Sequence, residues 1–130
     1  MENVPNSPLG VMYREHIQLI LDKNIEALLD QYTDDALLIS SFTKEPVIYK
    51  GRERIKEHMQ GILGIDGLES DIIFWAETEN PTTLMITEQI TMTVGQEKSK
   101  MRFADSWVLE DGKIAIHFAG MVQHPDGSLA

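Results

Sequence analysis

The stretch KMRFADSWVLEDGKIAIHFAGMVQ, residues 100–123, decides the fold that this sequence predicts. It contains two β-rich runs separated by EDGK (110–113), and Asp-Gly between such runs is a strong signal for a tight hairpin turn. Asp105 stands in the middle of the first run and His117 in the middle of the second, each among apolar neighbours. An acid and a titratable base inside an apolar hairpin indicate a functional surface that the rest of the chain should cover.

The composition indicates one ordinary globular domain. Of the 130 residues, 42% are hydrophobic and 25% are charged. The net charge of -10 argues against nucleic acid and anionic membranes as partners, since both need a basic surface. No run reaches the roughly 18 apolar residues of a membrane span, and the N-terminus lacks the pattern of a signal peptide. Because there are no cysteines, disulfides and cysteine nucleophiles are excluded, and a cytoplasmic location is the default expectation.

Three amphipathic helices are predicted. Residues 1–8 read as a flexible lead-in, in which Ser7 and Pro8 can begin the first helix as its cap and first residue. Apolar residues at three- and four-residue spacing predict that helix over 9–23, with His16 inside its apolar stripe. Asn24 caps a shorter predicted helix over 25–32, and a third is predicted over 52–63.

Strands complete the predicted domain. They are expected over 36–42, 47–50, 68–77 and 82–94, followed by the hairpin, with turns at 33–35 and 43–46. Residues 124–130 read as a loose tail. Helices packed on a long antiparallel meander make an α+β domain over 9–123, in which a strongly curved sheet can wrap the helices and leave a cone-shaped cavity.

The order of these elements carries a family resemblance. Together with YTDDALLIS (32–40), KGRERIKEHM (50–59) and SWVLEDGKIAIHF (106–118), it resembles the nuclear-transport-factor-2-like superfamily, and within it ketosteroid isomerases and SnoaL-like polyketide cyclases. The resemblance implies a cone-shaped α+β barrel, a mixed or antiparallel curved sheet around the helices, an apolar cavity and a homodimer. It does not select a reaction, because this superfamily includes isomerases, dehydratases, cyclases, epoxide hydrolases and non-catalytic binding modules.

The resemblance also assigns residues. His16 falls where the isomerases hold a tyrosine oxyanion donor, Tyr32 matches a supporting tyrosine, and Asp105 matches an aspartate kept neutral by an apolar site. The position of the isomerase base holds Ser40, which cannot take a proton from carbon, so steroid isomerisation by the family mechanism is not expected. The SnoaL-like pattern, with an Asp and a His at the places of Asp105 and His117, fits better.

The orientation of the two hairpin residues stays open. Asp105 shares a strand face with Phe103 and Trp107; that face is either the cavity wall, where desolvation would raise the pKa of the carboxyl, or an outer surface facing basic neighbours. A three-residue turn would place His117 opposite Asp105 on the same face. A two- or four-residue turn would place it opposite Ser106 on the other face.

The predicted catalytic residues are Asp105, His16 and His117, a carboxyl and two imidazoles that suit proton transfer. No cofactor is expected, and a metal site of two histidines and one carboxylate is the less favoured reading of this cluster. His58 and His124 are expected to be exposed. The predicted substrate-binding wall is Tyr13, Ile20, Tyr32, Ser40, Phe42, Met59, Trp75, Phe103 and Trp107. Solvated strand ends and turns are predicted for Glu77, Glu79, Glu88, Glu97, Glu110 and Asp111.

The expected function is a small cofactor-free enzyme that isomerises, dehydrates or cyclises a hydrophobic polyketide-, terpenoid- or steroid-like molecule. A non-catalytic small-molecule-binding or dimerisation module is the alternative, which Ser40 favours. Epoxide hydrolysis would need a second carboxylate in the cavity, and the sequence indicates none with confidence. A homodimer is expected through the sheet face that no helix covers, with Met92, Val94, Ala104, Val108 and Met121 as candidate contacts.

Overall fold

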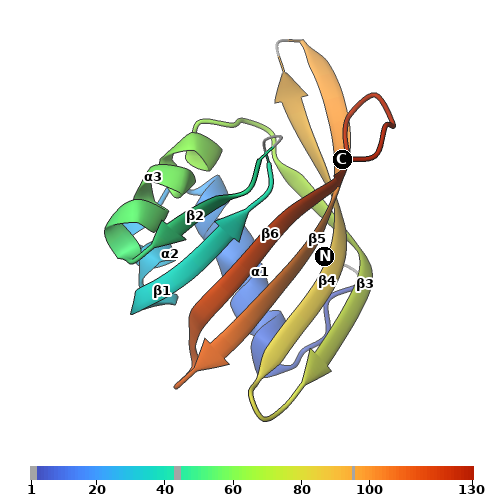
Figure 1. Cartoon of the computed structure of the whole chain (residues 1–130). Coiled ribbons are helices and arrows are strands. Elements are labelled where there is room, and N and C mark those ends of the chain that lie inside the picture. The colour runs from blue at the N-terminus through green and yellow to red at the C-terminus, as the bar shows by residue number, and fades with distance from the viewer. Residues whose placement is uncertain (1–2, 43–44, 95) are drawn as a thin grey trace.

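The computed structural model describes residues 3–42, 45–94 and 96–130. Within them the elements follow the predicted order of two helices, two strands, a third helix and four long strands (Figure 1). Their bounds are α1 Pro8–Leu21, α2 Ile25–Leu29, β1 Tyr32–Ser40, β2 Val47–Lys50, α3 Arg52–Leu63, β3 Glu69–Thr78, β4 Thr83–Val94, β5 Glu97–Glu110 and β6 Lys113–Gln123.

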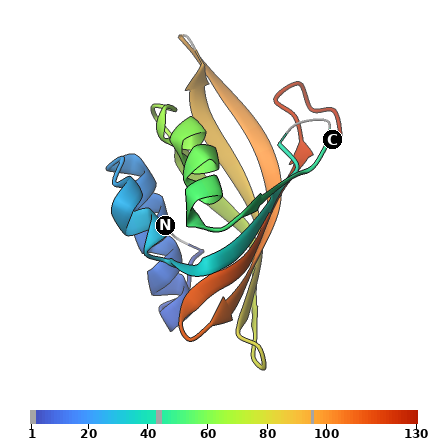
Figure 2. The same cartoon turned by 60° about the vertical axis from the view of Figure 1, so that its left-hand side comes forward.

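The strands form one mixed sheet in the order β2-β1-β6-β5-β4-β3. The β1–β6 pair is parallel and every other neighbouring pair is antiparallel. The sheet is strongly curved, and the helices lie on its concave side (Figure 2). It does not close into a complete barrel, because β2 and β3 are both edge strands. The predicted α+β cone is therefore confirmed, as an open cone.

The first helix begins as predicted. The Ser7 hydroxyl accepts a hydrogen bond from the backbone N–H of Gly10 at 3.1 Å, and Pro8 occupies the first turn, where its missing N–H is not needed. Neither α1 nor any other helix in the described ranges is long and apolar enough to cross a membrane.

The second helix is shorter than predicted, and the turn expected at 33–35 is wrong. The helix ends at Leu29, and Tyr32 starts β1 with its backbone paired to Ile114 of β6. Arg52 donates two hydrogen bonds to the Tyr32 carbonyl, at 2.5 and 3.1 Å, which ties the beginning of the strand to α3. The register shift between Tyr32 and Leu37 takes up the residues that the sequence marked as a turn.

The hairpin has a two-residue turn and a bulge. Asp111 and Gly112 both have positive φ, 51° and 78°, as a tight hairpin turn requires. A register shift follows, because Leu109 pairs with Ile114 whereas Val108 pairs with Ile116. The extra residue shifts the pairing of β6 by one position. His117 therefore lies opposite Trp107, and not opposite Asp105 or Ser106 as in the two predicted registers.

Residues near both ends of the described chain form contacts with the strands. Near the N-terminus, Val4 is buried and the Asn3 amide donates to the Ile72 carbonyl of β3 at 3.1 Å. The C-terminal segment folds back on β6, since Leu129 forms an isolated bridge with Gln123. Both ends of the described chain therefore contact the sheet.

The hydrophobic core lies between the helices and the concave face of the sheet. Its least exposed members come from α2, β1, α3 and β6, and Leu28, Leu38, Ile55 and Ile114 are each 0% exposed. This packing fixes the inner faces of β5 and β6 relative to the helices, and so positions the side chains that project from these faces.

Candidate active site

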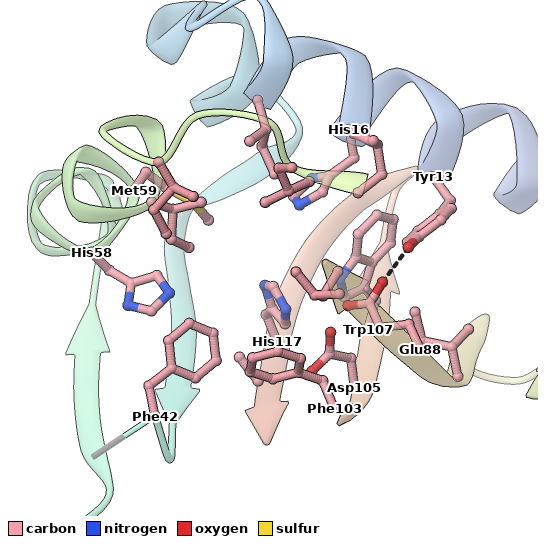
Figure 3. A pocket seen from close by; sticks show the side chains of 18 of the residues that line it. Tyr13, His16, Phe42, His58, Met59, Glu88, Phe103, Asp105, Trp107 and His117 are labelled. Carbon is pink, nitrogen blue, oxygen red and sulfur yellow. Dashed lines mark hydrogen bonds between the residues drawn. The ribbon is translucent and has the colours of Figure 1, made fainter. Parts of the chain in front are cut away.

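A largely apolar cavity lies between α1, α3 and the inner face of β4, β5 and β6 (Figure 3). Its volume is about 90 Å³, taken as the space open to the centres of water-sized molecules. The wall consists of Tyr13, His16, Ile17, Ile20, Phe42, His58, Met59, Ile62, Ile65, Leu68, Ile86, Glu88, Ile90, Met92, Phe103, Asp105, Trp107, His117 and Ala119.

The structure brings most of the predicted site residues together in this wall. These are Asp105, His16, His117, Tyr13, Ile20, Phe42, Met59, Phe103 and Trp107. Tyr32, Ser40 and Trp75 do not line it. Ser40 is buried in β1 beside Ala119, Tyr32 lies behind His117, and Trp75 packs edge-on against Tyr13 with ring centres 5.5 Å apart.

Glu88 is the residue that the sequence interpretation misplaced. It was expected at a solvated strand end, but it lies within β4, is 6% exposed and lines the cavity. Its Oε2 accepts short hydrogen bonds from the Tyr13 hydroxyl and, at 2.9 Å, from Ser70 Oγ. Tyr13 and Ser70 also contact each other at 2.8 Å. Glu88 therefore accepts hydrogen bonds from two hydroxyl groups.

Asp105 lies beside Glu88 on the neighbouring strand, with its carboxyl group directed into the cavity (Figure 3). Burial raises the pKa of Asp105 well above its usual value, and the charge of Glu88 and a side-chain hydrogen bond with Glu88 raise it further. The backbone N–H of Gly120 donates to Oδ1 at 3.2 Å and opposes the rise. The result is a carboxyl group that holds its proton beside one that accepts hydrogen bonds.

The two imidazoles line the same cavity, and His117 lies diagonal to Asp105, since Asp105 pairs with Ala119 on β6. His117 is directly opposite Trp107 across β5 and β6, and the hairpin bulge places it on the cavity face. Its ring centre is 6.3 Å from that of His16, which α1 supplies. Burial, followed by the positive potential of His16 and then His58, lowers the pKa of His117. Burial also lowers the pKa of His16, so both rings are neutral bases near pH 7.

A third histidine, His58, also lines the cavity, although the sequence predicted that its side chain would be exposed. His58 of α3 is half-buried, and the centre of its ring lies 5.2 Å from the ring centres of both Phe42 and Tyr49. Burial lowers the pKa of His58 from 6.5 to about 4. The predicted exposure of His124 is also wrong, since this residue is half-buried where the C-terminal segment folds back.

The donor set suits protons rather than metals. In the described ranges, no three His, Asp or Glu side chains are arranged to hold a metal ion. The cavity instead offers a protonated carboxyl, a carboxylate supported by two hydroxyls, and two neutral imidazoles. Such groups can give and take protons at different atoms of one bound molecule.

The fold and the cavity define a small α+β protein with paired carboxyl groups in a largely apolar site. A family model for the SnoaL-like domain matches residues 13–117, and the chain belongs to this family, within the nuclear-transport-factor-2-like superfamily. No protein of curated function matches the sequence significantly.

Solved structures share the fold at low sequence identity. The epoxide hydrolase/cyclase-like enzyme SalBIII, described for pyran ring formation in the polyether salinomycin, is 13% identical with a TM-score of 0.70, over 84% of this chain and 86% of that one. A candidate isomerase from Bacillus subtilis is 12% identical with a TM-score of 0.72, over 84% and 82%. A candidate calcium/calmodulin-dependent protein kinase II association domain from Xanthomonas campestris is 16% identical with a TM-score of 0.68, over 87% and 84%.

Proposed function

We propose that this protein is a cofactor-free enzyme that catalyses an isomerisation or cyclisation of an uncharged hydrophobic molecule. The observation that carries the proposal is the Asp105–Glu88 pair, in which a carboxyl with a raised pKa lies beside a buried carboxylate inside an apolar cavity. Two titratable groups whose surroundings favour opposite protonation states are the usual basis of acid–base catalysis.

The pair of carboxyl groups carries one proton, which suits a reaction in which the enzyme takes up no net proton. Asp105 gives its proton to an oxygen of the substrate, and Glu88 accepts a proton from a second atom, either a carbon or a hydroxyl. The pair then holds one proton, as before, and transfer between the two carboxyl groups restores the starting state. Tyr13 and Ser70 hold Glu88 in place through this cycle.

Opening of an epoxide is the favoured form of this chemistry. An acid protonates the epoxide oxygen while a base takes the proton of the attacking water or internal hydroxyl. The sequence alone indicated no second carboxylate for this role, and Glu88 now supplies one. The similarity in fold to an epoxide hydrolase/cyclase-like enzyme agrees with this choice.

The proposal is tested with a panel of small lipophilic epoxides, hydroxy-epoxides and enones, followed by mass spectrometry. The wild-type protein should convert at least one of them, and Asp105→Asn and Glu88→Gln should each reduce kcat/KM by about 100-fold or more. Glu110→Gln, at the exposed end of β5, is the matched control and should retain full activity. Turnover that survives in Glu88→Gln would rule out the paired mechanism.

A non-catalytic binding module is the second candidate. Ser40, at the position of the isomerase base, favours it, as does the similarity in fold to an association domain. This function predicts that the wild type and Glu88→Gln bind panel members equally well and that neither converts them.

We also propose a homodimer, located in the cytoplasm, that forms through the outer face of the sheet. Phe118 alternates with the cavity residues His117 and Ala119, so its side chain points outward, where it is 45% exposed. The row continues on both sides through the paired residues Ile39 and Ile48 in one direction and Ser106 and Met85 in the other. This largely apolar row, interrupted by Ser106, suits contact with a second copy.

The composition of this face differs from the earlier expectation. Ala104 and Val108 lie on it, since they alternate with cavity residues of β5. Met92 lines the cavity instead, and Met121 packs against the core. The side chain of Val94 lies outside the described residues.

A further inference from the structure

The two cavity histidines are held by partners of opposite hydrogen-bonding character. Nδ1 of His16 lies 2.9 Å from Oε1 of Gln31, and Nδ1 of His117 lies 2.8 Å from the hydroxyl of Tyr32. Neither Gln31 nor Tyr32 lines the cavity, so each holds the rear of its ring. The free edges of both imidazoles therefore face the cavity (Figure 3).

Gln31 determines the proton position on His16. Its amide nitrogen donates to the carbonyl of Met12 at 3.2 Å. A flipped amide would set two oxygen acceptors against each other, so the carbonyl oxygen is the atom that faces His16. An amide oxygen can only accept, and Nδ1 of neutral His16 must therefore carry the proton. Nε2 of His16 is left as a bare acceptor.

Tyr32 determines the opposite state for His117. The Tyr32 side chain is 0% exposed, and Nδ1 of His117 is the one partner of its hydroxyl in the described part of the chain. A buried hydroxyl donates its hydrogen to such a partner, because an unpaired buried O–H is costly. Nδ1 of His117 is then the acceptor, and Nε2 carries the proton.

We infer that Nε2 of His16 and Nε2–H of His117 form a matched acceptor and donor for one hydroxyl group of the substrate. A hydroxyl can donate to the first nitrogen and accept from the second, whereas a ketone or an ether can only accept. The ring centres are 6.3 Å apart, a separation that one oxygen atom can bridge. In the described residues, neither Nε2 atom forms a hydrogen bond with the protein.

The inference defines the substrate class more narrowly than the proposed function, on which it rests for the choice of cavity. The substrate is an uncharged, largely apolar alcohol, because neutral imidazoles offer no counter-charge to an acid or an amine. Its hydroxyl binds between His16 and His117, and the reacting group faces Asp105 and Glu88. Gln31 and Tyr32 are positioning residues, since they act through the two histidines.

The proton positions are tested by ¹⁵N NMR of histidine-labelled protein, in which protonated and bare ring nitrogens have well-separated shifts. The wild type should show His16 as the Nδ1–H form and His117 as the Nε2–H form. Gln31→Met should move His16 toward the Nε2–H form and leave His117 unchanged, and Tyr32→Phe should affect only His117. In each variant, the signal of the unaffected histidine therefore serves as the control for correct folding. The inference is overturned by His16 protonated at Nε2, or by His117 protonated at Nδ1, in the wild type.

The ligand preference is tested with cyclohexanol and methylcyclohexane, which have similar shapes and differ in the hydroxyl group. Cyclohexanol should shift both Nε2 signals and bind about tenfold more tightly than methylcyclohexane. In Gln31→Met this preference should be lost, whereas in Glu88→Gln it should persist. Equal binding of the two probes overturns this inference alone. Binding of the alcohol without any turnover of the panel overturns the proposed function alone.

Discussion

Glu88 and Asp105 occupy diagonal positions on one face of two neighbouring strands, since Asp105 pairs with Ile86 and Glu88 pairs with Phe103. Diagonal neighbours of this kind are within reach of each other's side chains. Two carboxyl groups at this spacing in an apolar wall cannot both be ionised without a large cost. Burial, followed by the charge of Glu88, raises the pKa of Asp105, while the hydroxyl groups of Tyr13 and Ser70 donate to Glu88.

This relationship predicts how Asp105 affects stability as pH changes. The pKa of Asp105 is raised in the folded state, so the folded protein holds a proton that the unfolded chain has lost above its usual value of 3.8. The Asp105 contribution to stability is therefore complete below about pH 4 and declines as pH rises toward the raised pKa. Relative to the wild type, Asp105→Asn should gain stability between pH 4 and 7, as measured by urea unfolding. Asp71→Asn, on the exposed surface of β3, should show no such trend.

His58 should have the opposite pH dependence. Its pKa is lowered from 6.5 to about 4, so between these pH values the unfolded chain binds a proton that the folded protein does not bind. Stability should thus fall as pH decreases from 6.5 to about 4, with His58 contributing on the order of 2 kcal/mol after allowance for its partial exposure. His58→Gln should flatten this part of the pH profile in thermal unfolding. An unchanged slope, equal to that of His124→Gln, would contradict the assignment.

Two glycines should respond oppositely to alanine. Gly112 in the hairpin turn has φ of +78°, and nothing lies within 4 Å of an added Cβ, so Gly112→Ala should cost about 1 kcal/mol through backbone strain alone. Gly61 lies in α3, also with open space around an added Cβ, so Gly61→Ala should stabilise the protein by about 0.5–1 kcal/mol. Denaturant unfolding of both variants checks the signs. Destabilisation by Gly61→Ala would mean that α3 is not helical at this position.

Phe118→Glu should convert the proposed dimer into a monomer. The charge would lie at the centre of the apolar outer row, facing the second copy, where it would lose its water. Light scattering coupled to gel filtration measures the mass directly. Val11→Glu is the control, because Val11 is 57% exposed on α1, away from the outer face of the sheet. A wild-type protein that is monomeric at micromolar concentration would contradict the proposal.

The sequence indicated the fold because local patterns and global order agreed. Helical spacing, the Ser7 cap and the Asp-Gly turn each predict elements that the structure contains. The predicted end of the second helix was wrong because Tyr32 continues the apolar stripe of that helix. Pairing with Ile114 and the hydrogen bonds from Arg52 draw Tyr32 into β1, and both are tertiary interactions that a local pattern cannot show.

The site was only partly predictable for two different reasons. Glu88 could have been found, because Leu84, Ile86, Ile90 and Met92 alternate with it along β4 and define a buried face that it interrupts. The orientation of His117 could not, since it depends on a bulge that no residue type in the hairpin announces. The contacts of Gln31 and Tyr32 likewise arise only when α1, β1 and β6 are assembled.

The position of β6 within the sheet affects the synthesis of this protein. Of the six strands in this sheet, β6 is the last in chain order, yet it lies between β1 and β5 and joins them. Until residues 113–123 emerge, β1 and β2 have no sheet to join, and the inner faces of both nascent halves are exposed to solvent. The cone can therefore form only after all six strands of the sheet are made, and the nascent chain depends on protection of its apolar strands until residues 113–123 emerge.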